Sequence, residues 1–291
     1  MQVVIHAGAH FTDDNRLIDC LLRDSDMLAA EGAYVPEPRL YRRTLRGIIH
    51  DALSHGLTEQ GILSVHTSLA RDNAANRLIL SNSSFFGTPK MAVGRGFFYP
   101  GAESRLAIFQ DIFSDSHVEL FLGLRNPATF LPALFNSVPT RDMSAFLSDF
   151  EPEDFQWSET IIRLRDRFPD LSIVTWCNED SPLIWGQLLR EMAGLAPNAP
   201  IAGEFDLLKY IMTEKGWTRF DRFISKRPNL SEAQKRKVIQ AFLETFVKVD
   251  EIEEELDLPG WDEARIEAIT EAYDDDVEAI ARLSGVTLIT P

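Results

Sequence analysis

The first residues of the chain specify a β-loop-α unit. Residues 3–7 form an almost continuous apolar run, small residues follow at Gly8 and Ala9, and apolar side chains then recur with helical spacing over residues 17–28. Gly32 supplies a stop to that helical pattern. A loop of this kind presents successive backbone N–H groups at a helix N-terminus, where they can bind an anion. The segment therefore predicts a phosphate-cradling scaffold.

Further strand patterns alternate with helical ones along the chain. The strongest strand patterns cover residues 3–5, 78–80, 118–124 and 171–175. Because each is a continuous apolar run, we expect an α/β fold with a mostly parallel sheet that is covered on both faces. Residues 33–35 and 286–289 predict two shorter strands, and the sequence becomes chiefly helical after Gly203. We expect one domain over residues 1–291.

Charge is distributed unevenly. The formal net charge is −16, and positions 250–278 hold fourteen Asp and Glu residues against the single Arg265. We interpret this acidic segment as a solvated helical face. Nucleic acid is not an expected partner, because its binding needs a clustered basic surface. A basic stretch over residues 215–237 leaves two interpretations open: it faces a phosphorylated ligand, or its acidic neighbour neutralises it.

The sequence also bears on compartment. No apolar stretch approaches the roughly 18 to 20 residues that span a bilayer, so we expect no membrane insertion. The N-terminus has no basic flank or cleavage site of an export signal. Cys20 and Cys177 both lie in apolar periodic segments and are predicted to be small buried side chains. These features predict a cytoplasmic protein.

The lining of the first loop does not match a phosphate site. Phe11 stands where a cation is expected, and Asp13 and Asp14 lie at the predicted start of the helix. A carboxylate at this position suits a helix N-terminus as a cap, because it satisfies the N–H groups that a phosphate would otherwise take. The backbone pattern therefore predicts an anion site, whereas the side chains of the loop predict that an anion is repelled.

Several short motifs resemble the bacterial sulfotransferase family. His6, Gly8, His10 and Thr12 fit the family's opening strand and loop, and the sequence Leu-Arg-Asn-Pro at 124–127 resembles its later strand and helix. The C-terminus is similar too, with Tyr273-x-x-Asp276, Leu283-x-Gly285-Val286 and a terminal Ile-x-Pro.

The resemblance implies a P-loop-type three-layer fold with a helical C-terminal portion, and 3′-phosphoadenosine 5′-phosphosulfate as cofactor. It places cofactor contacts at the following residues: Gly8, Ala9, His10, Phe11, Thr12 and Arg125. Arg125 corresponds to the arginine that binds the cofactor's 3′-phosphate. No other partner or acceptor is implied.

This chain departs from the family pattern at residues that bind the cofactor or take part in catalysis in the family. Phe11 replaces the loop lysine, Asp13 and Asp14 replace a glycine and a threonine, Ser83 stands where a glutamate base is common, and Ala133 replaces a serine. Two carboxylates about 5 to 6 Å from a phosphate would each cost about 3 kcal/mol at an effective dielectric near 20. Of the family's functional side chains, Arg125 is the one that this chain keeps.

Two functions follow from this comparison. In the first, the protein is sulfotransferase-like but has lost phosphosulfate-dependent catalysis, and it acts as a binding or structural partner. In the second, it is an active sulfotransferase that transfers a sulfuryl group to a hydroxyl or amine acceptor through an altered site. His10 is then the candidate general base, with His117 as an alternative.

The remaining groups of residues do not predict a functional site. His6 and His10 are separated by a strand and a turn, so we expect no metal site there. The acidic runs Glu179-Asp180 and Asp274-Asp275-Asp276 are interpreted as solvated charges. The loop over residues 94–101 is interpreted as a surface segment that could move.

Overall fold

Strand residues alternate between two buried faces of one sheet. In the first strand, Val3 and Ile5 pack into one hydrophobic core, whereas Val4 packs into a second core on the other face. The same alternation places Leu120 and Leu122 in the first core and Phe121 in the second. The expected burial on both faces is therefore confirmed. The computed structural model describes every residue except 70–74, 141, 252–257 and 259.

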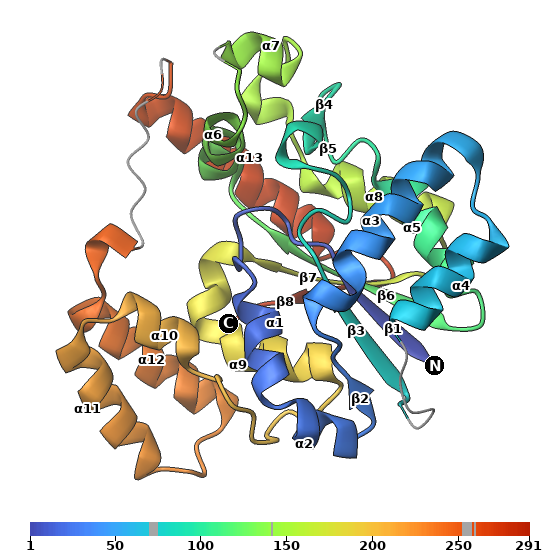
Figure 1. Cartoon of the computed structure of the whole chain (residues 1–291). Coiled ribbons are helices and arrows are strands. Elements are labelled where there is room, and N and C mark those ends of the chain that lie inside the picture. Colours follow the sequence, from blue (N-terminus) through green and yellow to red (C-terminus); the bar gives the residue numbers. More distant parts are fainter. Residues whose placement is uncertain (70–74, 141, 252–257, 259) are drawn as a thin grey trace.

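The main sheet has six strands in the order β2-β3-β1-β6-β7-β8, and every neighbouring pair is parallel (Figure 1). Its strands are β1 Gln2–His6, β2 Ala33–Tyr34, β3 Arg77–Ser81, β6 His117–Leu124, β7 Ser172–Cys177 and β8 Val286–Ile289. A separate antiparallel hairpin consists of β4 Val93–Gly94 and β5 Phe97–Phe98. The predicted parallel α/β sheet is confirmed, including its two short strands.

Helices cover both faces of the sheet. The second core joins the sheet to α1 Arg16–Arg23, α2 Ser25–Ala30 and α9 Ser181–Ala193. The first core joins it to α3 Pro38–His55, α4 Glu59–Ser68, α5 Ala102–Ile112, α6 Pro127–Ser137, α8 Trp157–Arg167 and α13 Glu263–Ile280. The single helix expected over residues 17–28 is two helices, because the chain turns at Asp24 between α1 and α2.

The order of the strands fixes where a ligand can enter. From β1 the chain proceeds toward β2 on one side, whereas from β6 it proceeds to β7 on the other. The loops that follow β1 and β6 therefore diverge at the carboxyl edge of the sheet. In open parallel sheets this divergence opens a crevice between the two loops, and ligands bind there.

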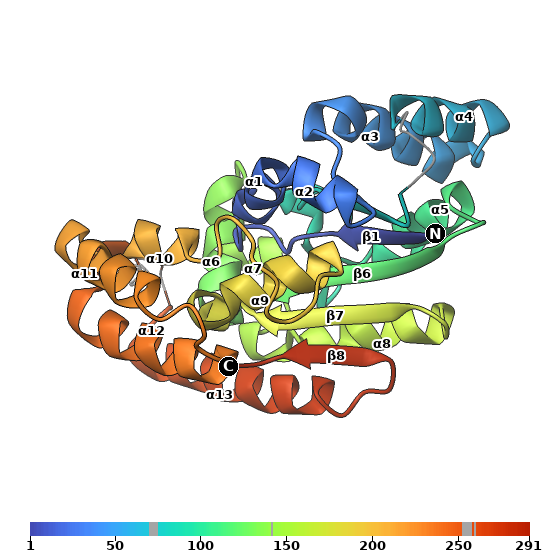
Figure 2. The ribbon, with the colours of Figure 1, turned by 90° about the horizontal axis from the view of Figure 1, so that it is seen from below.

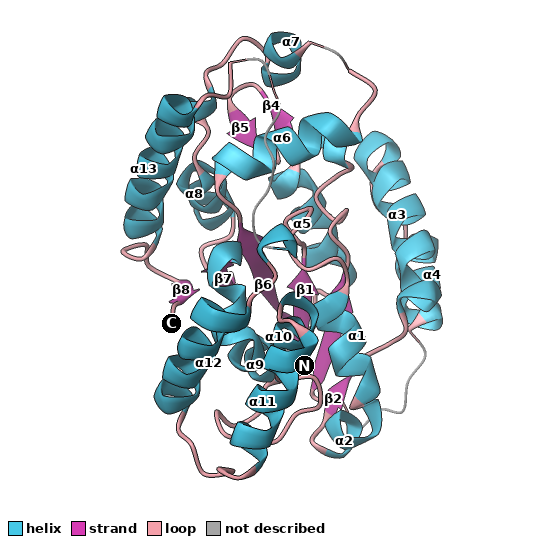
Figure 3. Ribbon diagram, turned by 90° about the vertical axis from the view of Figure 1, so that its left-hand side faces the viewer, coloured by secondary structure: helices cyan, strands magenta, loops and turns pink. Residues whose placement is uncertain are grey.

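The helices α10 Asp206–Ile211, α11 Glu214–Ser225 and α12 Glu232–Phe246 form a group with its own small apolar core. Figures 2 and 3 show this group next to α9, beyond the carboxyl ends of the strands. A short helix, α7 Met143–Leu147, lies near the β4–β5 hairpin. The predicted helical character of the chain after Gly203 is confirmed.

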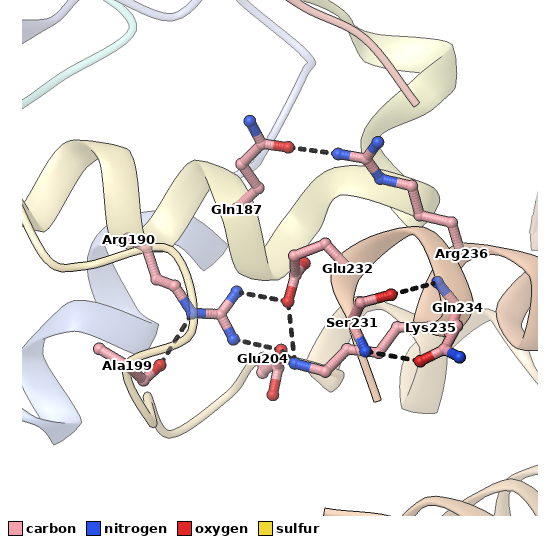
Figure 4. A network of polar contacts seen from close by, with 9 residues as sticks. All are labelled: Gln187, Arg190, Ala199, Glu204, Ser231, Glu232, Gln234, Lys235 and Arg236. Atoms are coloured by element: carbon pink, nitrogen blue, oxygen red, sulfur yellow. Dashed lines mark hydrogen bonds and ion pairs between the residues drawn. The ribbon is translucent and has the colours of Figure 1, made fainter. Parts of the chain in front are cut away.

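A buried network of charges fastens α12 to α9 (Figure 4). The side chain of Arg190 is 2% exposed and pairs with Glu204 and Glu232. Lys235 contacts the same two carboxylates, at 2.6 Å and 2.9 Å. Two cations and two anions thus compensate one another, which a buried ion network requires. Lys235, part of the basic stretch, is neutralised here and not by the acidic segment.

The acidic side chains of this segment that the structure describes are exposed, except that of Asp276. Asp274 and Asp275 are exposed as expected, but Asp276 is buried at 5% exposure, so its interpretation as a solvated charge was wrong. Its carboxylate accepts hydrogen bonds from the backbone N–H groups of Trp157, at 2.7 Å, and Ser158, at 3.2 Å. Asp276 therefore caps α8 from a distant part of the chain. Residues 252–257 and 259 of this segment lie outside the described part.

We predict that Asp276→Ala lowers the free energy of unfolding by about 2 kcal/mol, because two N–H groups at the start of α8 lose their acceptor. Asp276→Asn keeps one acceptor oxygen, and burial raises the pKa of Asp276, so the amide should cost less. Urea unfolding followed by circular dichroism measures both variants. Exposed Asp275→Ala is the matched control and should stay within about 0.5 kcal/mol of the parent. Equal losses for Asp275→Ala and Asp276→Ala would refute the cap.

Candidate functional site

The loop after β1 already uses several of its backbone donors within the protein. The N–H of Ala9 donates to the carbonyl of Gly123 at 3.1 Å, and the N–H of His10 donates to the Tyr99 hydroxyl at 3.0 Å. Gly8 has a φ of +95°, and a Cβ there would lie 3.1 Å from the Ser83 Cα. The loop path therefore depends on glycine at this position, and the N–H groups of Ala9 and His10 face protein acceptors.

The start of α1 is occupied by a side chain. The helix begins at Arg16, later than expected, so Asp13 and Asp14 precede it. Asp13 is 7% exposed, and its Oδ2 accepts the backbone N–H of Leu17 at 3.3 Å. The N-cap residue is Asn15, which makes no side-chain cap bond, but a carboxylate does accept an N–H of the first turn as expected, and it belongs to Asp13, two residues earlier. Its negative charge stands at the helix end where an anion would bind.

His10 forms a buried pair with Tyr99. The two rings stack with centroids 5.7 Å apart, and Nδ1 of His10 lies 2.7 Å from the Tyr99 hydroxyl. Because that hydroxyl oxygen accepts the His10 N–H, its own hydrogen is free to bond Nδ1, which leaves the ring proton on Nε2. Burial lowers the pKa of His10 to about 4, and the Gly87 carbonyl opposes this shift. His10 is therefore a neutral imidazole at pH 7.

Tyr99 is a residue that the sequence did not reveal. It lies in the segment interpreted as a surface loop, yet it is fully buried, and burial raises the pKa of its hydroxyl. The interpretation of residues 94–101 as a surface segment was wrong at this position. A run of aromatic residues, Phe97-Phe98-Tyr99, was the available signal.

Arg125 lies at the carboxyl end of β6, as the sequence predicts. Its guanidinium donates to the Phe11 carbonyl at 2.7 Å and to the Thr129 hydroxyl at 3.0 Å. The indole N–H of Trp157 donates to the Arg125 carbonyl at 2.9 Å, which fixes the backbone. Thus Arg125 and the first loop are brought together, 114 residues apart in sequence.

A cavity of about 710 Å³ opens between these two loops. It lies at the divergence of β1 and β6 and reaches the α10–α12 group. It is lined by Phe11, Thr12, Asp14, Arg16, Arg125, Asn126, Thr129, Asn178, Glu179, Ser181, Pro182, Leu207, Tyr210, Ile211, Glu251 and Ile266. Three of these side chains are acidic and two are basic, so the wall carries no excess of positive charge.

Glu179 is an acid of this cavity whose pKa is raised. Burial raises its pKa, while the Asn126 N–H, the Tyr273 hydroxyl and the charge of Arg125 lower it. The two donors lie 2.8 Å and 3.3 Å from its oxygens. Glu179 is nevertheless exposed, so its interpretation as a solvated charge is confirmed, although helix α13 carries Tyr273 against it.

A second, smaller pocket of about 260 Å³ adjoins the first loop on the side of β3. It is lined by Ala9, His10, Phe11, Asp13, Asp14, Asn15, Ser81, Ser83, Ser84 and Pro89. Ser83 is thus placed next to the loop. His117 is not: it lies at the first residue of β6, at the opposite edge of the sheet, so the alternative of His117 as the base is wrong.

The cofactor contacts implied by the resemblance fall on both sides of the loop. Ala9, His10 and Phe11 line the smaller pocket, and Phe11, Thr12 and Arg125 line the larger one. Within the described residues, no group of three or more His, Cys, Asp or Glu side chains has an arrangement that could hold a metal ion. No helix in the described part is long and apolar enough to cross a membrane.

Comparisons with known proteins found no family model, curated protein or solved structure that matches this chain. The similarity to sulfotransferases therefore rests on the residues named above.

We predict that His10 makes the protein sensitive to mild acid. Its pKa is about 4 in the folded protein, whereas the unfolded chain takes up that proton near pH 6.5. Stability should therefore fall as the pH drops from 6.5 to 4, by up to about 3 kcal/mol for this group. Relative to His10→Gln, the wild-type protein should lose this amount over that range, and the difference should be constant above pH 7.

Urea unfolding at several pH values measures this difference, and the other histidines cancel because both proteins contain them. If His10→Gln does not fold, an NMR titration of the imidazole Cε1–H signals of the wild-type protein replaces it. A His10 signal that titrates near pH 6.5 would contradict the buried neutral imidazole.

Proposed function

We propose that the chain is a sulfotransferase-like protein of the P-loop type that no longer performs phosphosulfate-dependent catalysis and acts as a binding protein. The observation that carries this proposal is the occupied loop. Ala9 and His10 direct their N–H groups to protein acceptors, and Asp13 takes the N–H of Leu17. An anion at the loop would have to displace these bonds and approach a buried carboxylate.

The charge of the larger cavity supports the same proposal. Asp14, Glu179 and Glu251 face a ligand there together with Arg16 and Arg125. A bisphosphate nucleotide carries several negative charges, and each nearby carboxylate costs it about 3 kcal/mol at 5 to 6 Å. The guanidinium of Arg125 also donates a hydrogen bond to the Phe11 carbonyl. The cavity suits a small polar ligand better than a nucleotide.

One observation favours a second candidate, the active sulfotransferase with 3′-phosphoadenosine 5′-phosphosulfate as its cofactor. Arg125 and the first loop line the same cavity, as that cofactor requires. His10 fits the role of base less well, because Tyr99 occupies Nδ1 and Nε2 carries the proton. A single-turnover assay with this cofactor and mixed hydroxyl and amine acceptors tests this candidate. We expect no release of 3′-phosphoadenosine 5′-phosphate above the uncatalysed rate.

Calorimetric titration with 3′-phosphoadenosine 5′-phosphate tests the main proposal, and we predict a dissociation constant above about 1 mM. The triple variant Phe11→Lys, Asp13→Gly, Asp14→Gly should bind at least tenfold more tightly, because it adds a cation and removes two carboxylates. Glycine is chosen at position 14 because φ there is +48°, which a β-branched residue adopts poorly.

The matched control, Asp19→Asn with Asp26→Asn, removes two exposed negative charges elsewhere and should leave the affinity unchanged. Micromolar binding of 3′-phosphoadenosine 5′-phosphate by the natural chain would favour the active sulfotransferase over the binding protein. No gain in the triple variant, with its fold confirmed by circular dichroism, would remove the sulfotransferase-like assignment of the loop.

A further inference from the structure

The smaller pocket is lined by a buried carboxylate, Asp13, and by the buried Nε2 of His10, which has no hydrogen-bond partner within the described residues. It lies between the first loop and the segment that follows β3, and its volume is about 260 Å³. This is below the usual range for drug-sized ligands, so the pocket suits a molecule of monosaccharide size or smaller. Asp13 is 7% exposed and His10 is 4% exposed, and both line the pocket.

Asp13 brings a carboxylate that forms no ion pair within the described residues. One of its oxygens accepts the Leu17 N–H. Asp14, on the same wall, has Arg16 at 3.5 Å, and the Asp14 side chain is 65% exposed. A buried carboxylate without a cation is costly, and a protonated amine is the simplest ligand group that would compensate it.

His10 brings a hydrogen-bond donor. Its Nδ1 is bound by the Tyr99 hydroxyl, so Nε2 carries the ring hydrogen. In the described part of the chain, no acceptor reaches hydrogen-bond geometry with this buried Nε2, although the Gly87 carbonyl lies near enough to the ring to raise its pKa. A ligand hydroxyl or other neutral oxygen would satisfy it.

The nearby cation, Arg42, forms no ion pair with Asp13. Arg42 lies beside the pocket, but its Nε donates to the Ser81 carbonyl at 2.8 Å and a terminal nitrogen donates to Oδ1 of Asn15 at 2.7 Å. These bonds direct the guanidinium at neutral oxygens of the wall. The hydroxyl groups of Ser83 and Ser84 add further polar surface that both donates and accepts.

We propose that this pocket binds a small amino alcohol, with the protonated amine at Asp13 and a hydroxyl oxygen at the Nε2–H of His10. The inference rests on the proposed function, since it requires that the loop is not an anion site. It adds the chemical class of the ligand. A neutral polyol lacks the charge for Asp13, and a simple alkylamine lacks the oxygen for His10, so both should bind more weakly.

The experiment uses the full-length protein and D-glucosamine as the probe, followed by calorimetry and by ¹⁵N–¹H NMR. We expect saturable binding of D-glucosamine, at least tenfold weaker binding of D-glucose, and a shift of the His10 imidazole signals on saturation. Asp13→Asn, which keeps an acceptor for Leu17, should lower the affinity at least tenfold. The control Asp19→Asn should stay within twofold, because Asp19 is exposed on α1.

Absence of saturable binding at 50 mM D-glucosamine would overturn the proposal, and so would equal affinity of Asp13→Asn and the parent. If Asp13→Asn does not fold, the imidazole shift in the parent protein decides, since binding that leaves His10 unmoved places the amine elsewhere. Failure here is distinct from failure of the proposed function, because the proposed function is tested with a different ligand, 3′-phosphoadenosine 5′-phosphate.

Discussion

The hydrogen bond from the Leu17 N–H to the Asp13 carboxylate determines what the carboxyl edge of the sheet can bind. In the β-loop-α unit of an anion site, the backbone N–H groups at the start of the helix are free to bind a ligand. In this chain a carboxylate from the loop itself takes that place, at 3.3 Å and nearly out of reach of water. The β-loop-α backbone is retained, but the site now favours a cation over an anion. Both proposals for the site follow from this change.

The C-terminal helix α13 holds the other wall of the site. Asp276 caps α8 through the N–H of Trp157, and the indole of Trp157 in turn donates to the carbonyl of Arg125. From the same helix, Tyr273 donates to Glu179 in the larger cavity. A motif that the sequence relates to a family's C-terminus thus has a physical role, which is to fix the two strand ends that face the first loop.

Much of the fold could be predicted because it is encoded locally. Apolar runs of strand length identify β1, β3, β6 and β7, and the Asn126-Pro127 start of α6 is confirmed by a bond from the Ala128 N–H to the Asn126 side chain at 2.9 Å. The site was less predictable because its contacts join distant segments. His10 and Tyr99 are 89 residues apart, and Glu179 and Tyr273 are 94 apart. No local pattern reports which distant side chains meet in this way.

The central claim is that the N–H groups of Ala9, His10 and Leu17, in the first loop and at the start of α1, are already satisfied by the protein. A ¹⁵N–¹H NMR titration of the natural chain with 3′-phosphoadenosine 5′-phosphate, which observes the amide signals of Ala9, His10 and Leu17, tests it most directly. The account predicts that these three signals do not move up to about 1 mM nucleotide, the affinity limit that corresponds to about 4 kcal/mol. Saturable shifts of all three signals at micromolar nucleotide would show that the loop opens to an anion and would contradict the account.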